Sequence, residues 1–158
     1  MTYRYSPEFI RATTLPALQE GFARGGRTRE GFTINCQALV ITGFSEEECH
    51  QAEVGTKMQL AFYGSTPQYR CVFETHGWGE AQTELNALSK QGRWMEMAAL
   101  IDDRMLDAFT VRAEPAQVAA RLRARYGGLV DRLSLICHSQ PQRTNPERWA
   151  EVVAACRA

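Results

Sequence analysis

The segment FTINCQALVIT, residues 32–42, constrains the fold of this chain more than any other. β-Branched and apolar residues dominate it and Gly43 closes it, which predicts a β-strand. One of its faces is entirely apolar, with Phe32, Ile34, Cys36, Ala38 and Val40. The other face is mixed but uncharged, whereas a strand with one face in water would carry charges there. The pattern favours a strand that is covered by helices outside and faces a partly polar interior, as in a barrel.

A second strand is predicted at DRLSLIC, residues 131–137. The long connection between the two strands is mostly helical in pattern, including segment 80–106, which is broken near Gly92. A short extended piece, AFTVRA at residues 108–113, interrupts the helices. Parallel pairing needs such a helical crossover, so we expect strands 32–42 and 131–137 to lie side by side and parallel.

Three helix starts are marked by their capping residues. Ser6 and Asn145 are each followed by proline, a residue that suits the first turn of a helix. Ser45 is followed by three glutamates, of which Glu48 is placed to complete a capping box. Helices alternating with strands are typical of an α/β domain.

Length and charge limit the classes of function. The chain has 158 residues, enough for one domain, with 18 basic and 18 acidic residues and no block of like charge. Nucleic acid and membrane surfaces are therefore not expected as partners. The sequence has no apolar run of transmembrane length, and its start lacks the apolar core of a signal peptide. We expect a soluble, cytoplasmic protein.

Cysteine and histidine spacing predicts no metal site. The five cysteines are odd in number and lack CxxC spacing, which favours free thiols in a reducing compartment. The three histidines are widely separated, and no carboxylate–histidine pattern accompanies them.

The stretch FYGSTPQYRCVFETHGWGE, residues 62–80, does not read as a core helix. Turn residues interrupt its aromatic side chains, whereas a core helix repeats apolar residues every three or four positions. Aromatic rings with a few convergent hydroxyl groups suit a planar heterocycle. The alternative is that these side chains only pack this segment against the rest of the protein or a partner.

Four segments together resemble a known family. They are SPEFIRATTLPALQEGFARGGR, QLAFYGSTPQYRCVFETHGWGE, ELNALSKQGRWMEMAALIDDRMLDAFTV and EPAQVAARLRARYGGLVDRLSL. In this order they resemble the C-terminal part of the luciferase-like monooxygenase superfamily. Within it, the chain is most similar to oxidoreductases that use the deazaflavin coenzyme F-420.

The resemblance implies a fold as well as a chemistry. It implies the C-terminal portion of a (β/α)8 TIM-type barrel, as a single partial domain over residues 1–158. A helical insertion, at about residues 44–113, would separate the last two strands. Family members are about twice this length, so the first strands, which supply much of the cofactor bed, would be absent. The cofactor would lie at the C-terminal ends of the strands.

The same resemblance suggests a set of pocket residues, while no catalytic residue can be named. It places the 62–80 stretch over the barrel mouth, where its side chains would line a pocket for substrate or for coenzyme F-420, with FMN as the alternative cofactor. His138 follows the second strand and would point into the mouth as a proton donor or phosphate contact, unless it is a solvated loop residue. The set comprises Tyr63, Ser65, Thr66, Tyr69, His76, Trp78 and His138.

The expected function is therefore part of a flavin- or deazaflavin-dependent oxidoreductase. Hydride transfer or monooxygenation of a small-molecule substrate would take place at the barrel mouth, and the chain would be inactive without the N-terminal half. The alternative is a noncatalytic α/β interaction module, or remnant, that pairs with another chain. Exposed strand edges predict self-association or pairing with the missing barrel half.

Overall fold

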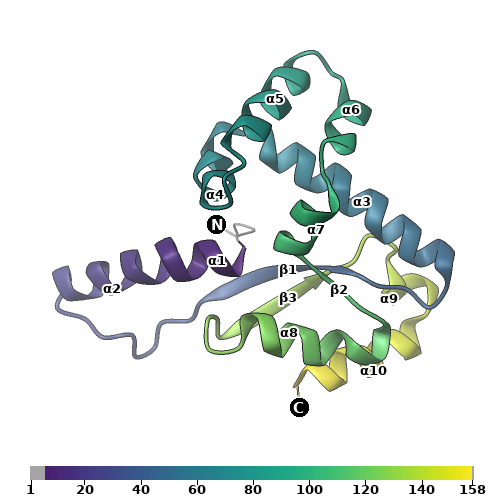
Figure 1. The fold of residues 1–158 in the computed structure, drawn as a ribbon. Coiled ribbons are helices and arrows are strands. Elements are labelled where there is room, and N and C mark those ends of the chain that lie inside the picture. Colours follow the sequence, from purple (N-terminus) through teal and green to yellow (C-terminus); the bar gives the residue numbers. More distant parts are fainter. Residues whose placement is uncertain (1–5, 158) are drawn as a thin grey trace.

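The computed structural model describes residues 6–157, which form a three-stranded sheet with helices on both sides (Figure 1). The strands are β1 (Asn35–Ile41), β2 (Thr110–Arg112) and β3 (Arg132–Ile136), in the order β2-β1-β3. All neighbouring strands are parallel. The central position of β1 explains why its sequence carries the strongest strand pattern, since it is covered on both faces.

β1 and β3 pair as the sequence predicts. Asn35 lies opposite Arg132, and the parallel register continues to Leu39 opposite Ile136. The predicted strands 32–42 and 131–137 are therefore confirmed in position and direction, each somewhat longer than the observed strand.

The short piece at 108–113 is more than a connection. Its residues Thr110–Arg112 form β2, which pairs with residues 39–41 at the other edge of β1. The expectation that only two strands are present is therefore wrong. Three residues carry too little alternation to be recognised as a strand, and β2 is fixed instead by tertiary pairing with β1.

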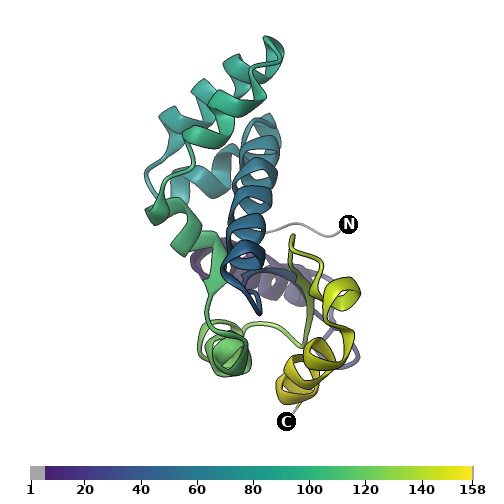
Figure 2. The same cartoon turned by 90° about the vertical axis from the view of Figure 1, so that its right-hand side faces the viewer.

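Two helices cover the apolar face of β1. α8 (Val118–Tyr126) follows a 3-10 helix (Pro115–Gln117), and α10 (Pro146–Arg157) follows the short α9 (Pro141–Thr144). Both lie below the sheet in Figure 1, and the rotated view in Figure 2 places them on the same side. This face forms one of two hydrophobic clusters, with Cys36, Ala38, Val40, Val111, Val118, Leu122, Tyr126 and Val152 among its buried members.

The opposite face of the sheet is covered by the helices between β1 and β2, which rise as an arm in Figures 1 and 2. Leu39 and Ile41 are buried here, whereas Asn35 is exposed. The predicted partly polar interior is thus limited to the start of β1, because the helical arm buries its end. The elements are α3 (Glu46–Gly64), a 3-10 helix (Pro67–Tyr69), α4 (Arg70–Thr75), α5 (Gly79–Lys90), α6 (Trp94–Ala99) and α7 (Asp103–Phe109).

The N-terminal helix begins at the predicted cap. The Ser6 hydroxyl accepts a hydrogen bond from the backbone N–H of Phe9, at 3.2 Å. The helix continues as α1 (Pro7–Phe9), a π-helical segment (Ile10–Thr14) and α2 (Leu15–Arg24). No residue of α2 is buried, and α2 extends away from the sheet (Figure 1).

α3 begins as predicted, with one difference. Ser45 Oγ accepts from the backbone N–H of Glu48 at 3.2 Å, so Ser45 is the N-cap. The Glu48 carboxylate accepts from the N–H of Phe44 at 2.6 Å, one residue before the position that a capping box requires. Among residues 6–157 no helix is both long and apolar enough to cross a membrane.

Candidate functional site

The carboxyl ends of the three parallel strands lie at one edge of the sheet, which is where α/β proteins commonly bind ligands. Thr42 follows β1, Ala113 follows β2, and Cys137 follows β3. We therefore describe this edge as the candidate site, together with the predicted residues of the 62–80 stretch.

Buried polar contacts hold the ends of β1 and β3 together. Cys137 Sγ lies 3.5 Å from the carbonyl oxygen of Thr42 and 3.2 Å from Ser139 Oγ. Ser139 Oγ donates to the same carbonyl at 3.4 Å. All three residues are buried, so this group fixes the geometry of the edge and presents no reactive group to solvent.

His138 lies at this edge against α3. Its Nε2 is 2.8 Å from Gln59 Oε1, and since an amide oxygen only accepts, Nε2 is the donor. Gly55, one turn earlier on α3, leaves room for the imidazole: a Cβ there would lie 2.5 Å from His138 Cβ. His138 is predicted to point into the barrel mouth; in the structure its imidazole lies against α3, beside Gly55 and Gln59.

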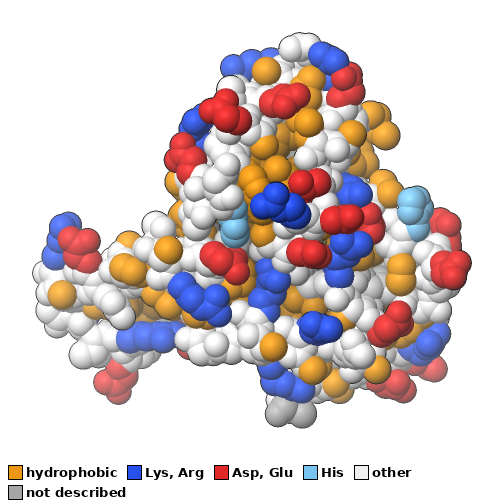
Figure 3. All heavy atoms as spheres, viewed as in Figure 1, with side chains coloured by type: hydrophobic (Ala, Val, Ile, Leu, Met, Phe, Trp, Pro, Cys, Tyr) orange, Lys and Arg blue, Asp and Glu red, His pale blue; other side chains and the backbone are white. Residues whose placement is uncertain are grey.

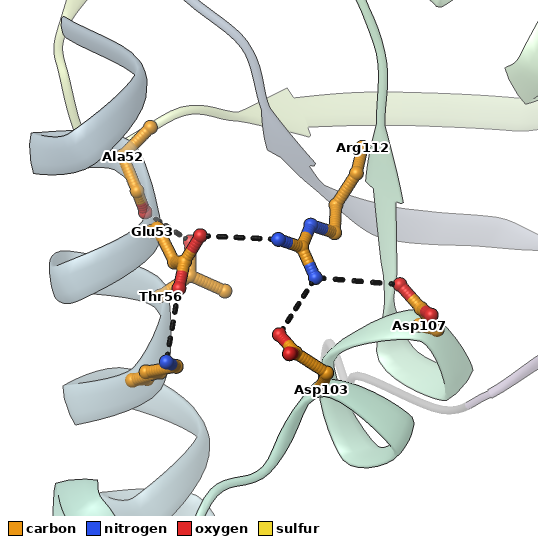
Figure 4. A network of polar contacts seen from close by, with 7 residues as sticks. Ala52, Glu53, Thr56, Asp103, Asp107 and Arg112 are labelled. Carbon is orange, nitrogen blue, oxygen red and sulfur yellow. Dashed lines mark hydrogen bonds and ion pairs between the residues drawn. The ribbon is translucent and has the colours of Figure 1, made fainter. Parts of the chain in front are cut away.

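Arg112, the last residue of β2, joins the sheet to the arm (Figure 4). Its Nη2 lies 3.2 Å from Glu53 Oε2, and its Nη1 lies 2.9 Å from Asp103 Oδ1 and 3.6 Å from Asp107 Oδ1. Glu53 also pairs with Lys57 Nζ at 2.9 Å. Burial opposes the charge, but the hydrogen bond to Asp103 and the three carboxylates raise the pKa of the Arg112 guanidinium.

Tyr63 and Tyr69 of the 62–80 stretch lie together. Their ring centroids are 5.4 Å apart in an edge-to-face arrangement. Both border a crevice of about 10 Å³, whose wall also includes Phe73 and Phe109. A crevice of this volume holds about one water molecule, whereas small-molecule pockets occupy roughly 300–1,000 Å³.

The hydroxyl group of Ser65 is hydrogen-bonded to the backbone. Ser65 Oγ donates to the carbonyl oxygen of Phe62 at 2.7 Å, and Asn86 Nδ2 donates to the carbonyl of Ser65 at 2.8 Å. Ser65 is buried and Thr66 is half-buried, with an extended backbone that separates α3 from the following 3-10 helix. These two residues shape the turn.

His76 and Trp78 form a second pair in the turn between α4 and α5. Their rings are stacked, with centroids 4.7 Å apart, and both lie against Phe109. His76 Nε2 is 2.7 Å from Ser6 Oγ. Burial lowers the pKa of His76, Glu8 opposes this change, and Arg125 adds to it.

The seven predicted residues thus form three groups. Tyr63 packs with Tyr69, and His76 stacks on Trp78, whereas His138 contacts Gln59 at the end of β3. The described residues close no pocket of coenzyme size beside the aromatic stretch, so they do not fit the ring of a flavin or deazaflavin by themselves. A coenzyme contact for any of the seven stays a prediction.

A larger hollow, of about 490 Å³, lies at the carboxyl ends of β1 and β2. Glu46 and Glu114 contribute to its wall, and Arg148 lies over the ring of Phe44 at 4.1 Å. Burial, followed by the charge of Glu114, raises the pKa of the Cys49 thiol in the same wall. Two carboxylates oppose the phosphate groups that both candidate coenzymes carry, so this hollow does not suit a coenzyme phosphate.

Sequence reasoning missed the residues that connect the strand ends to the arm. Gln59 and Arg112 were not singled out, because a lone amide on a helix or a lone charge on a short extended piece is usually a surface residue. Arg112 lies at the end of an extended piece, just before Glu114-Pro115, where a helix begins. This position at a strand-to-helix connection was the signal in the sequence that could have identified Arg112.

Comparisons with known proteins agree with this arrangement. The family model described as luciferase-like monooxygenase matches residues 1–132. Uncharacterized proteins of Mycobacterium bovis and Mycobacterium tuberculosis are each 46% identical to the chain over 128 residues, or 81% of the chain. This match covers 38% of each relative, so the chain spans less than two-fifths of their length.

A solved structure shares the fold. It is the coenzyme F-420-dependent tetrahydromethanopterin reductase of Methanopyrus kandleri, with a TM-score of 0.65 and 20% sequence identity. The likeness covers 94% of this chain and 41% of the reductase chain. The three parallel strands and their helices therefore match part of a luciferase-like structure. From the family match over most of its length, the chain belongs to the luciferase-like monooxygenase family.

Proposed function

We propose that the chain is part of a flavin- or deazaflavin-dependent oxidoreductase, and that it forms the C-terminal portion of its (β/α)8 barrel. The main support is the fold likeness over 94% of the chain to a coenzyme F-420-dependent reductase, together with family membership. Coenzyme F-420 is the preferred cofactor and FMN is the alternative.

The open sheet leaves room for further strands, although its order β2-β1-β3 differs from that of three successive strands of a (β/α)8 barrel, in which β2 would lie between β1 and β3. β3 is an edge strand, and within residues 6–157 no other strand pairs with its outer edge. A hollow of about 730 Å³ lies beside it, between α8 and α10, and its wall includes Leu122, Leu133 and Leu135. An added strand followed by a helix would pair with this edge and cover Leu133 and Leu135, which are only half-buried.

In the proposed enzyme, this chain supplies one wall of the active site and the remaining strands supply the coenzyme bed. When bound, the coenzyme would accept or donate the hydride. His138, held by Gln59, would face the substrate from the strand ends. The 62–80 segment would cover the barrel mouth and exclude water from it.

A second candidate is the noncatalytic module that pairs with another chain. The unpaired edge of β3 and the small crevice beside Tyr63 and Tyr69 favour it, because the first offers a pairing surface and the second offers no ligand space. It predicts binding to the same partner without binding of coenzyme.

The experiment is a fluorescence titration of the purified chain with coenzyme F-420 and, separately, with FMN. Each titration is run alone and after addition of a complementary segment, the part of the Mycobacterium tuberculosis relative outside the 128 matched residues. The proposal expects coenzyme binding only in the mixture. His138→Gln should leave the affinity for the segment unchanged.

Three other outcomes have distinct meanings. If the segment binds but neither coenzyme does, the noncatalytic module replaces the proposed enzyme. If the chain alone binds coenzyme tightly, the described fold does not need further strands. If neither the segment nor a coenzyme binds, both candidates are wrong.

A further inference from the structure

The helical arm carries an exposed apolar surface on α3 and α6. Among residues 6–157, six large hydrophobic residues are exposed, and five of them lie on these two helices: Val54, Met58, Phe62, Trp94 and Met95. Their exposed fractions range from 41% for Val54 to 73% for Met95. We call these five residues the arm surface. Single exposed hydrophobic residues are common on proteins, whereas a group of them in one place indicates a contact surface.

The three residues of α3 share one face of that helix. Val54, Met58 and Phe62 are spaced four residues apart, so each lies about one turn beyond the one before it. Ala52 and Thr56, on the opposite face, are buried against the rest of the protein. A helix with one face in water normally carries polar residues on that face. The apolar outer face of α3 therefore favours a second covering partner.

α6 enlarges the same surface. The ring centroids of Phe62 and Trp94 are 6.4 Å apart, and Met95 follows Trp94 in the first turn of α6. Hydrophobic side chains are visible at the surface of the arm in Figure 3. A large side chain has about 150–250 Å² of surface, so five that are about half exposed present on the order of 500 Å².

Further strands would not cover the arm surface. They would extend the sheet at its edges, whereas Ala52 and Leu60 of α3 pack in the cluster that joins the arm to β1, and the arm surface is on the other side of α3. In Figures 1 and 2, α6 lies high on the arm and away from the sheet. The surface is therefore accessible in the proposed enzyme as well as in the chain alone.

The charges beside the arm surface are paired within the chain. Arg93 forms an ion pair with Glu96, and Lys57 Nζ lies 2.9 Å from Glu53 Oε1. Such a rim has no net charge, so two copies that meet here bring no excess of like charges together. An anionic membrane surface would instead attract an excess of basic residues. The charges thus favour a second copy of the chain over a lipid surface.

The area is sufficient for a dimer. Two copies of the arm surface would bury about 1,000 Å² in total, which is about the minimum for a specific interface. Aromatic and methionine side chains are also enriched at the centres of such interfaces. In a two-fold dimer the same surface lies on both sides of the contact, so no complementary surface is needed elsewhere on the chain.

We propose that the arm surface binds the arm surface of a second copy of this chain in a two-fold dimer. This contact is separate from the edge of β3, and it does not depend on the coenzyme or on completion of the barrel. The proposal can therefore fail while the proposed oxidoreductase stands, and the reverse also holds.

The test is sedimentation of the purified full chain with the substitution Ser134→Lys, which weakens association through the edge of β3. This chain should still form dimers as its concentration rises. Adding Phe62→Ser should raise the dimer dissociation constant about tenfold or more, because aromatic residues at the centre of an interface contribute most to binding. A chain that stays monomeric without Phe62→Ser, or a dimer that Phe62→Ser leaves unchanged, would overturn the proposal.

Phe32→Ser is the matched control. Phe32 is the remaining exposed large hydrophobic residue of the described range, with 45% of its surface exposed against 55% for Phe62. It lies away from the arm, where its ring packs on Phe22 with centroids 5.2 Å apart. Phe32→Ser should leave the dimer unchanged. Equal losses in the two variants would show that total apolar surface drives association and would refute the contact.

Two charged variants test whether a second copy is the partner. Met58 is the middle residue of the α3 face, so in a two-fold dimer it lies near its counterpart. Met58→Lys and Met58→Glu, each with Ser134→Lys, should be monomeric alone and form a mixed dimer when combined, because opposite charges then meet. A fluorescent label on one variant detects this dimer by sedimentation. If both variants melt like the parent chain and the mixture stays monomeric, the arm surface does not bind a second copy.

Discussion

The Nε2 atom of His76 lies 2.7 Å from the hydroxyl oxygen of Ser6, 70 residues away in the sequence. Ser6 is also the N-cap of the first helix, so one hydroxyl group both caps that helix and connects it to the turn before α5. The contact makes the first helix and the helical arm interdependent.

This contact predicts a loss of stability in acid. The pKa of His76 is lowered by burial in the folded protein, whereas the unfolded chain has the ordinary value of 6.5. The unfolded state therefore binds the proton more readily. Stability contributed by neutral His76 is fully present above pH 6.5 and is lost as the pH falls below that value. Urea unfolding between pH 8 and pH 5 measures it.

The control for this prediction is another histidine. His76→Gln should flatten the pH dependence, while His50→Gln, at an exposed position on α3, should retain it. If both variants follow the wild-type curve, protonation of His76 does not control acid stability.

The close approach of Gly55 to His138 predicts a steric effect. Gly55→Ala would place a Cβ 2.5 Å from His138 Cβ and 2.7 Å from its Cγ. We expect a destabilisation of about 1–3 kcal/mol, as for other overpacked sites. Gly21→Ala is the matched control inside α2, where a Cβ meets nothing within 4 Å, and it should stabilise by about 0.5–1 kcal/mol. Thermal melts of both variants measure these effects, and a Gly55→Ala variant as stable as the wild type would contradict the close contact with His138.

The Glu48 carboxylate connects the start of α3 to residues 144 and 145, so we expect its removal to destabilise the protein. Besides Phe44 N–H, it accepts hydrogen bonds from Thr144 Oγ1 at 2.9 Å and Asn145 Nδ2 at 2.6 Å. Glu48→Ala should cost about 2–3 kcal/mol, because it leaves several donors without their acceptor. Amide exchange in α10 should also become faster.

The neighbouring glutamate separates this effect from loss of charge. Among the described residues, the Glu47 side chain is hydrogen-bonded only to Gln51, on the exposed face of α3. Glu47→Ala should therefore change the free energy of unfolding by less than about 0.5 kcal/mol. Equal effects of the two substitutions would mean that Glu48 does not connect α3 to the last helices.

These contacts mark how far sequence reasoning could go. Caps and strands such as Ser45 and residues 132–136 were predictable, because their signals lie within a few neighbouring residues. The pairing of β2, the Arg112 network and the His76–Ser6 contact were not, since each depends on groups brought together only by folding. The role of the aromatic stretch stays a prediction, and the packing of His76 and Trp78 onto Phe109 could not be read from spacing.

The exposed edge of β3 predicts self-association of the chain on its own. Ser134 is exposed on this strand, and Ser134→Lys should weaken association about tenfold or more by placing charge at the contact. Gln142→Lys, at an exposed position of α9, is the control. Sedimentation at several concentrations gives the dissociation constants.

A second exposed surface, on the helical arm, could also mediate self-association, and the same sedimentation experiment distinguishes it from the edge of β3. Phe62 is 55% exposed on α3, and its ring centroid lies 6.4 Å from that of the exposed Trp94 of α6. Figure 3 shows hydrophobic side chains at the surface of the arm. If Phe62→Ser abolishes association and Ser134→Lys does not, the chains associate through the arm rather than through the strand edge.

Hydrogen exchange at β3 tests most directly whether this chain is part of a larger barrel. Because β3 pairs on one side only, its outward N–H groups should exchange quickly in the chain alone. Adding the complementary segment of the mycobacterial relative should slow exchange across Arg132–Ile136 by about 100-fold or more, while α8 changes little. Uniform protection of β3 in the chain alone, or no change on adding the segment, would contradict the account.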